Sequence, residues 1–216
     1  LRSKNGKILR PPRILIINDY KSDPILWEHF KEVSQKSSAY IPVPIEFIDC
    51  AENCFLVDES TPTRPKKYRL ISDTQIVNSV APNFYTRLPQ ADLIVDQIPK
   101  DSVFVAHDFT KFYTQLVQDP RSAARHAIAL RGADGKTRGF LPTGLVFGAK
   151  LTPFIAIAIT SFLAGVLGQL GLLSFAYIDD ILVQVSNHLD PKNPEDLKEI
   201  EAISDWTATF LGGSGL

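Results

Sequence analysis

The chain has 216 residues, of which 44% are hydrophobic and 22% are charged, and its net charge is −1. This balance excludes a disordered, collagen-like or coiled-coil chain and predicts one large or two small globular domains that need no disulfides. Because the sequence contains no methionine, we expect it to be a piece of a longer polypeptide.

The first half of the sequence alternates short apolar runs with turn-rich segments. In chain order it predicts a strand near 11–16, a helix opened by Asp23 and Pro24, turns over 34–46, strands at 54–57 and 68–71, a helix at 91–98 and a strand at 102–106. The two strands at 54–57 and 68–71 would form a hairpin with a long basic tip between them.

The second half predicts more regular elements. In chain order these are a turn or helix at 112–117, a hairpin of strands 127–130 and 137–141, a helix at 151–170, two strands within 172–185 and a helix at 194–210. Asn193 is the expected N-cap of the last helix, with acidic residues in its first turn. Glycines from Gly212 onward are expected to end this helix.

Residues 151–177 contain no charge, and such a stretch is long enough to cross a bilayer. However, Gly165, Gly168 and Gly171 interrupt it, and it runs directly into two aspartates. A buried helix, a glycine turn and a core strand account for this pattern better than a membrane span, and we expect no membrane partner.

The two cysteines and the basic segments indicate the compartment and the kind of partner. Cys50 and Cys54 lie four residues apart without a neighbouring His, which favours free thiols in a reducing compartment over a zinc half-site. Residues 1–13 carry a charge of +5, and residues 64–69 and 121–138 carry +4 each. Such patches suit a polyanion bound in a groove, although each is equally compatible with a solvated surface.

Two adjacent aspartates, Asp179 and Asp180, interrupt an apolar run at 175–183. Neighbouring carboxylates repel each other unless a divalent cation neutralises them, but a plain hairpin turn is an equally good interpretation. Asp108 ends another apolar strand, where it could cap a helix or add a third carboxylate. Three carboxylates from two neighbouring strands would suit a pair of Mg²⁺ ions in phosphoryl transfer.

Four ordered blocks resemble the reverse transcriptases of retroviruses and gypsy-class LTR retrotransposons. They are YRLISD at 68–73 with Asn78, Asp108 followed by Tyr113, Gly148 followed by Pro153, and YIDD at 177–180. The blocks lie 40 residues (Asp108 to Gly148) and 29 residues (Gly148 to Tyr177) apart, which suits a compact palm. The resemblance covers about residues 50–210. Gly144 offers a second register for the third block, but no proline follows it at the required distance.

The resemblance implies an RNA-directed DNA polymerase, a nucleotidyltransferase that adds dNTPs to a primer 3′-hydroxyl. Asp108, Asp179 and Asp180 would be catalytic and would hold two Mg²⁺ ions, or Mn²⁺, with the backbone carbonyl of Phe109 as a further ligand. Tyr113 would exclude ribonucleotides. The other implied dNTP contacts are Arg69, Lys66, Lys67, Phe147 and Gly148, and Tyr177 would touch the primer end.

The implied fold is α+β, a polymerase right-hand palm with an antiparallel sheet backed by helices and a fingers subdomain, without the thumb. The expected division is a basic segment at 1–13, fingers at 14–98 and 119–146, and palm at 99–118 and 147–216. The expected partners are a primed RNA or DNA template, dNTPs, and the thumb and RNase H domains of a longer polyprotein. The expected location is the cytoplasm or a virus-like particle.

Two other functions remain open at this point. One is a catalytically inactive or domesticated domain that only binds nucleic acid. The other is a viral RNA-dependent RNA polymerase, a class that usually carries Gly before the paired acids and lacks a bulky residue at the position of Tyr113.

Overall fold

A computed structural model describes residues 13–37, 39–63, 65, 67–83, 90–186 and 188–213. The chain folds into two compact units, Leu1–Phe84 with Tyr113–Thr152, and Tyr85–Phe112 with Pro153–Leu216. The bounds of these units differ from those expected for fingers and palm, since residues 90–98 belong to the second unit and residues 113–118 and 147–152 to the first. The naming of the subdomains therefore stays a prediction, and residues 1–12 of the basic segment 1–13 lie outside the described residues.

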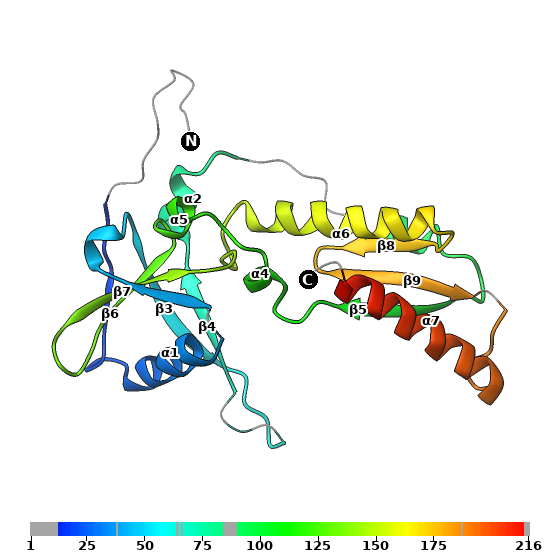
Figure 1. Ribbon diagram of the computed structural model, residues 1–216, viewed down its shortest axis with the longest axis horizontal. Helices are drawn as coiled ribbons and strands as arrows, with labels where there is room; N and C mark the ends of the chain where they lie inside the picture. Colours follow the sequence, from blue (N-terminus) through cyan, green and yellow to red (C-terminus); the bar gives the residue numbers. More distant parts are fainter. Residues whose placement is uncertain are drawn as a thin grey trace. The chain divides into compact units, whose positions relative to one another are not determined.

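The first unit is built on a mixed sheet (Figure 1). Its elements are β1 (Ile17–Asp19), α1 (Pro24–Ser37), β2 (Tyr40–Val43), the 3₁₀ helix η1 (Ile45–Phe47), β3 (Ala51–Asp58), β4 (Tyr68–Asp73), α2 (Gln75–Val80), α5 (Pro120–Ala123), β6 (Ala127–Arg131) and β7 (Thr137–Pro142). The strand order is β2-β7-β6-β3-β4, and β1 pairs with β6. The short helix α4 (Phe112–Gln115) begins where the chain enters this unit from the second.

The core of the first unit lies on both faces of this sheet. On one face, Leu26 and Phe30 of α1 pack against the buried side chains of Ile128 and Leu130. On the other face, small residues of β6 pack against Ile48, which follows η1. Successive residues of a strand point to opposite faces, so Ile128 and Leu130 face α1 while Ala127 and Ala129 face the other side.

Both predicted hairpins are confirmed, since β3 pairs with β4 and β6 pairs with β7 in antiparallel register. Of the strand expected near 11–16, residues 11 and 12 lie outside the described residues. Leu15 forms an isolated parallel bridge with Ala51 of β3, and the regular strand β1 begins only at Ile17. The expectation of turns over 34–46 also missed β2. Pro42 obscured this strand in the sequence, but β2 lies at the edge of the sheet, where a proline is tolerated.

The second unit is a three-stranded antiparallel sheet with helices (Figure 1). Its elements are α3 (Ala91–Val95), β5 (Val103–Asp108), α6 (Thr152–Gln169), β8 (Ser174–Tyr177), β9 (Asp180–Ser186) and α7 (Pro194–Gly213), and its strand order is β5-β9-β8. Leu167 of α6 and Leu211 of α7 pack in one cluster with Ile181 and Val183 of β9. The predicted α+β class, with a sheet backed by helices, is therefore confirmed.

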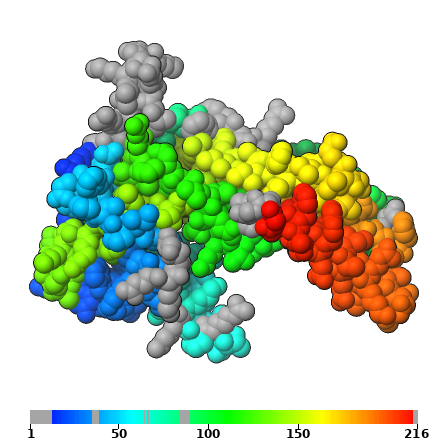
Figure 2. Space-filling model, viewed as in Figure 1, coloured from blue at the N-terminus to red at the C-terminus, as the bar shows by residue number. Residues whose placement is uncertain are grey.

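Helix α7 begins at the predicted cap, where the Asn193 side chain accepts a hydrogen bond from the Glu195 backbone N–H at 3.0 Å. It runs on to Gly213, beyond the predicted end. In Figure 2 the side chains of α7, orange to red, form a continuous exposed band. The glycines at 212 and 213 are thus part of the last turn.

Among the described residues, α6 is the one helix that is long and apolar enough to cross a membrane. This is weak evidence for a membrane span, because the core helix of a soluble protein has the same length and composition. The side chains of Leu163, Ala164 and Leu167 belong to the core of the second unit.

Candidate functional site

Two of the three predicted catalytic carboxylates lie on adjacent strands. Asp108 is the last residue of β5 and Asp180 is the first residue of β9, and the two are direct partners in the antiparallel ladder. Directly opposite residues on such a pair have Cβ atoms about 5 Å apart on the same face of the sheet. The structure therefore brings together two acids that are far apart in the sequence.

The third carboxylate, Asp179, lies in the turn between β8 and β9. Tyr177 pairs with Asp180, so the turn consists of only two residues, Ile178 and Asp179. Ile178 has φ +54°, a left-handed conformation that two-residue hairpin turns require but that a β-branched residue rarely adopts. Backbone outliers of this kind cluster at functional sites.

The turn is attached to α6 by one buried side chain. The hydroxyl of Thr160, which is fully buried, donates a hydrogen bond to the Ile178 carbonyl at 2.7 Å. Thr160 thus supplies the only polar side-chain contact that the structure describes between this helix and the turn. It fixes the carbonyl next to Asp179.

Electrostatic repulsion acts on the carboxylates. Burial raises the pKa of Asp180 above its ordinary value, and the negative charges of Asp179 and Asp108 raise it further. A divalent cation would relieve this repulsion, and carboxylate oxygens are the ligands that Mg²⁺ takes, so the chemical type of these donors suits the metal. Among the described residues, however, no group of three His, Cys, Asp or Glu side chains is gathered closely enough to hold a metal ion.

The two aromatic residues predicted next to the acids lie in the same unit. The Phe109 carbonyl, the predicted extra ligand, accepts a hydrogen bond from the Phe112 backbone N–H at 3.2 Å and retains a second lone pair. The ring of Phe109 packs against the core of the second unit. Tyr177 ends β8 and is 41% exposed, so its ring is accessible.

The predicted nucleotide contacts belong to the first unit. Tyr113 and Phe147 have ring centroids 5.7 Å apart in an edge-to-face arrangement, and Phe147 is 61% exposed. Gly148 is also exposed and has φ +90°, a backbone conformation that residues with a side chain rarely adopt. The alternative residue, Gly144, packs against the Thr114 backbone, where a Cβ would lie 2.3 Å from the carbonyl oxygen.

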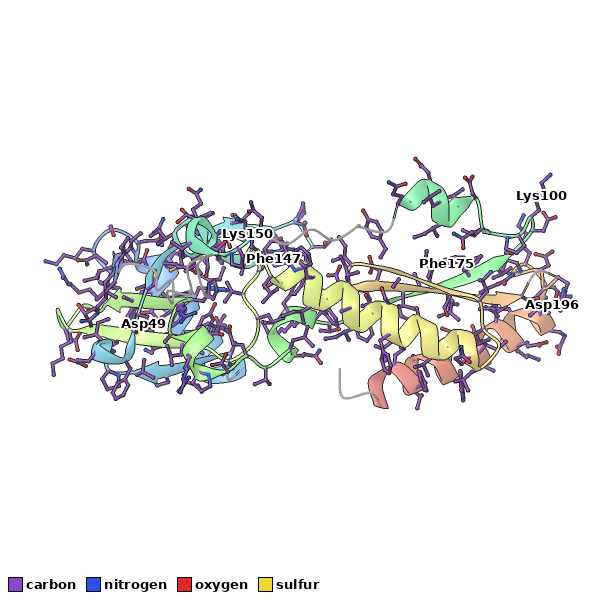
Figure 3. The ribbon with its side chains drawn as sticks, turned by 90° about the horizontal axis from the view of Figure 1, so that it is seen from above. Asp49, Lys100, Phe147, Lys150, Phe175 and Asp196 are labelled. Atoms are coloured by element: carbon purple, nitrogen blue, oxygen red, sulfur yellow. The ribbon has the colours of Figure 1, made fainter. Side chains whose placement is uncertain are left out.

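A hydrogen-bonded network holds the loop that carries Phe147 and Gly148. Figure 3 labels Phe147 and Lys150, which both belong to this loop. The Gly148 carbonyl accepts hydrogen bonds from the Thr74 hydroxyl at 2.8 Å and the Asn78 amide at 2.9 Å. The Asn78 side-chain oxygen accepts one from the Lys150 backbone N–H at 2.8 Å. Asn78, part of the first matching block, therefore fixes the loop of the third block.

The Lys150 ammonium adds to this network. It donates to the Asn78 carbonyl at 3.1 Å and to the Asn83 side chain at 2.9 Å. Sequence reasoning did not single out Thr74, Lys150 or Thr160. Thr74 directly follows the first matching block and Lys150 lies within the third, which is the one signal that could have indicated them.

Two predicted phosphate-binding cations lie on the β3–β4 hairpin. Arg69 of β4 and Lys67 just before it both pair with Glu59, at 2.7 and 3.0 Å. The third predicted cation, Lys66, lies outside the described residues.

A groove of the second unit lies between α3, α6 and β8. Mostly apolar and small residues line it, including Leu93, Gly168, Phe175 and Tyr177, together with uncharged polar residues such as Gln90. None of the described residues that line it is charged. The groove therefore does not suit the phosphates of a nucleotide.

Comparison with known protein families finds no family model that matches this chain, and a search of curated proteins finds no significant match.

Proposed function

We propose that this chain is the catalytic core of a reverse transcriptase of the retroviral or gypsy-class LTR type. It would transfer nucleotides from dNTPs to a primer 3′-hydroxyl on an RNA or DNA template. The observation that carries the proposal is the pairing of Asp108 with Asp180 across β5 and β9, with Asp179 in the adjoining turn. In this proposal the sheet of the second unit is the polymerase palm.

The role of the three carboxylates follows from their chemistry. Asp108 and Asp179 would hold two Mg²⁺ ions, Asp180 would assist, and the Phe109 carbonyl would complete the ligand set. The bound ions would make the 3′-hydroxyl more acidic and neutralise the charge of the departing pyrophosphate. Burial raises the pKa of Asp180, and the negative charges of Asp179 and Asp108 raise it further. This gathering of negative charge supports the role, because a site built for cations brings acidic groups together.

Other residues would orient the substrates. Arg69 and the lysines at 66 and 67 would hold the triphosphate, which a guanidinium can do through two parallel hydrogen bonds. The Tyr113 ring would exclude a 2′-hydroxyl, and Phe147 with Gly148 would pack against the nucleotide. Tyr177 would touch the primer end. These roles rest on the resemblance, and the aromatic contact of Tyr113 with Phe147 is compatible with them.

The decisive experiment is extension of a primed RNA template with Mg²⁺ or Mn²⁺. We expect Asp179→Asn to lower the rate by at least about 100-fold, because it removes a carboxylate that would hold the Mg²⁺ ions, whose positive charge would stabilise the transition state. Asp205→Asn, at an exposed position of α7 in the same unit, is the matched control and should leave the rate unchanged. Equal rates for wild type and Asp179→Asn would refute the proposal.

Two further readouts separate this proposal from the other functions. Binding of a primed template without any extension would favour an inactive nucleic-acid-binding domain. A Tyr113→Ala variant that newly incorporates ribonucleotides would support a DNA polymerase, whereas a wild-type chain that already prefers ribonucleotides would indicate an RNA polymerase.

A location in the cytoplasm or a virus-like particle, and partner domains in a longer polyprotein, belong to the same proposal.

A further inference from the structure

One carboxylate neutralises two cations on the β3–β4 hairpin. The Glu59 Oε1 atom lies 2.7 Å from the Arg69 Nε atom, and its Oε2 atom lies 3.0 Å from the Lys67 Nζ atom. Each oxygen of the Glu59 carboxylate therefore forms an ion pair with a different cation. Lys67 and Arg69 hold the pKa of the Glu59 carboxyl below its ordinary value.

The backbone of the hairpin fixes this arrangement. The Glu59 N–H donates to the Lys67 carbonyl at 2.8 Å, one step beyond the last ladder pair, Asp58 with Tyr68. Because side chains alternate along a strand, Glu59, Lys67 and Arg69 lie on the same face of the two-stranded ribbon. Glu59 is opposite Lys67 and diagonal to Arg69, and both positions are within reach of long side chains.

The exposure of the three side chains allows another anion to replace the Glu59 carboxylate. The Lys67 and Arg69 side chains are 51% and 59% exposed, whereas that of Glu59 is 24% exposed. Exposed ion pairs contribute little to folding, so an incoming anion can replace this carboxylate at small cost. A phosphate group offers the same two cations more oxygens and more negative charge than a carboxylate does.

We propose that Glu59 is an internal substitute for phosphate, which keeps Lys67 and Arg69 together on one face of the hairpin and must be displaced when a polyphosphate binds there. This inference deepens the proposed function and rests on it for the identity of the polyphosphate as a dNTP. Glu59 lowers the affinity of the two cations for polyphosphate and limits their binding of other anions.

The test measures binding of inorganic tripolyphosphate by titration calorimetry at low salt. We expect Glu59→Gln to bind about threefold more tightly than wild type, because one competing charge is removed. Glu46→Gln makes the same change of net charge at an exposed position of η1 in the same unit and should leave the affinity unchanged. Glu59→Asp keeps the charge and should stay within about twofold of wild type.

Two additional measurements make the result specific. In the Arg69→Gln background the gain from Glu59→Gln should be smaller, since the two residues act on the same anion. The gain should also shrink as salt is added, because exposed charges are screened. Equal effects of Glu59→Gln and Glu46→Gln, or weaker binding by Glu59→Gln, would overturn the inference.

The inference and the proposed function can fail separately. If Glu59→Gln binds tripolyphosphate more tightly but no variant extends a primer, the anion site stands and the polymerase proposal fails. If wild type extends a primer and Glu59→Gln leaves both the dNTP KM and the tripolyphosphate affinity unchanged, the inference fails alone.

Discussion

Glu52 is the most deeply buried acid among the described residues of the first unit. Its side chain is fully buried; Oε1 lies 3.3 Å from the His126 Nδ1 atom, and Oε2 has no hydrogen-bond partner among the described residues. Burial raises the pKa of Glu52 above its ordinary value, while the contact with His126 acts in the opposite direction. A buried carboxylate that is only partly satisfied costs stability whenever it is ionised.

This position predicts a pH dependence of stability. The folded state holds the Glu52 proton more tightly than the unfolded state does. The protonated side chain therefore contributes its full stabilisation of the fold below pH 4.5, the ordinary pKa, and this contribution is lost as pH rises through the higher pKa of the folded state. We therefore expect the free energy of unfolding of wild type, minus that of Glu52→Gln, to decrease with rising pH. Urea denaturation at a series of pH values measures this difference.

Asp119 provides a control of opposite sign. Hydrogen bonds from Ser122 and from the Arg121 backbone N–H lower the pKa of its carboxyl, which caps α5. The free energy of unfolding of wild type, minus that of Asp119→Asn, should decrease as pH falls. A flat or rising difference for Glu52→Gln would contradict the predicted role of burial.

At the scale of residues, sequence reasoning singled out groups with a local signature. Two adjacent aspartates within an apolar run are visible in the sequence, and the structure pairs one of them with Asp108. Glu52 and Thr160 carry no such signature, because their importance lies in burial and in partners at His126 and Ile178. Contacts of this kind depend on the fold and cannot be read from a single segment.

At the scale of elements, the hydroxyl of Thr160 couples α6 to the β8–β9 turn. Thr160→Val keeps the shape of the side chain but leaves the Ile178 carbonyl without this donor, and it should cost about 1–3 kcal/mol of stability. Under the proposed function, we also expect primer extension to fall, because the turn that carries Asp179 is less firmly held.

The matched control for this prediction is Thr209→Val. Its hydroxyl donates to the Asp205 carbonyl at 2.8 Å on the exposed side of α7, so its loss should have little effect. Thermal unfolding and the extension rate measure both variants. Equal destabilisation by the two substitutions would show that the contact with the turn contributes nothing specific.

The helices and strands were largely predictable where the spacing of apolar residues and the turn-forming residues agree. The Ala-Asp-Gly turn signal within 131–136, flanked by the segments 127–130 and 137–141, predicted β6 and β7, and the structure confirms the hairpin. The extension of α7 to Gly213 was missed, because glycine usually follows the end of a helix. Such local rules give way when tertiary packing stabilises one more turn, as the burial of Leu211 does here.

At the scale of the whole molecule, the three carboxylates belong to the second unit and the predicted nucleotide contacts to the first. Under the proposed function, Mg²⁺ binds only the folded second unit and stabilises it by mass action. We expect Mg²⁺ to slow amide hydrogen exchange in β5, β8 and β9 but not in β6 and β7. Asp179→Asn should abolish this protection, and equal protection of both sheets would indicate nonspecific binding.

Long-range topology was the part that sequence reasoning could not supply. The parallel pairing of β1 and β3 with β6 joins residues more than 70 positions apart, such as Ala51 and Ala127. No turn chemistry marks such pairs, which are stabilised by backbone pairing with β6 and by burial on both faces of this strand. The order of the strands therefore had to come from the structure.

The two cysteines have a practical consequence for solution experiments. Both are buried in the first unit, and burial raises the pKa of Cys50 to about 11 and that of Cys54 to about 12. Because only thiolates react rapidly with iodoacetamide, alkylation at neutral pH requires that this unit open. The chain has no other cysteine, so the rate of alkylation directly reports how often the first unit opens.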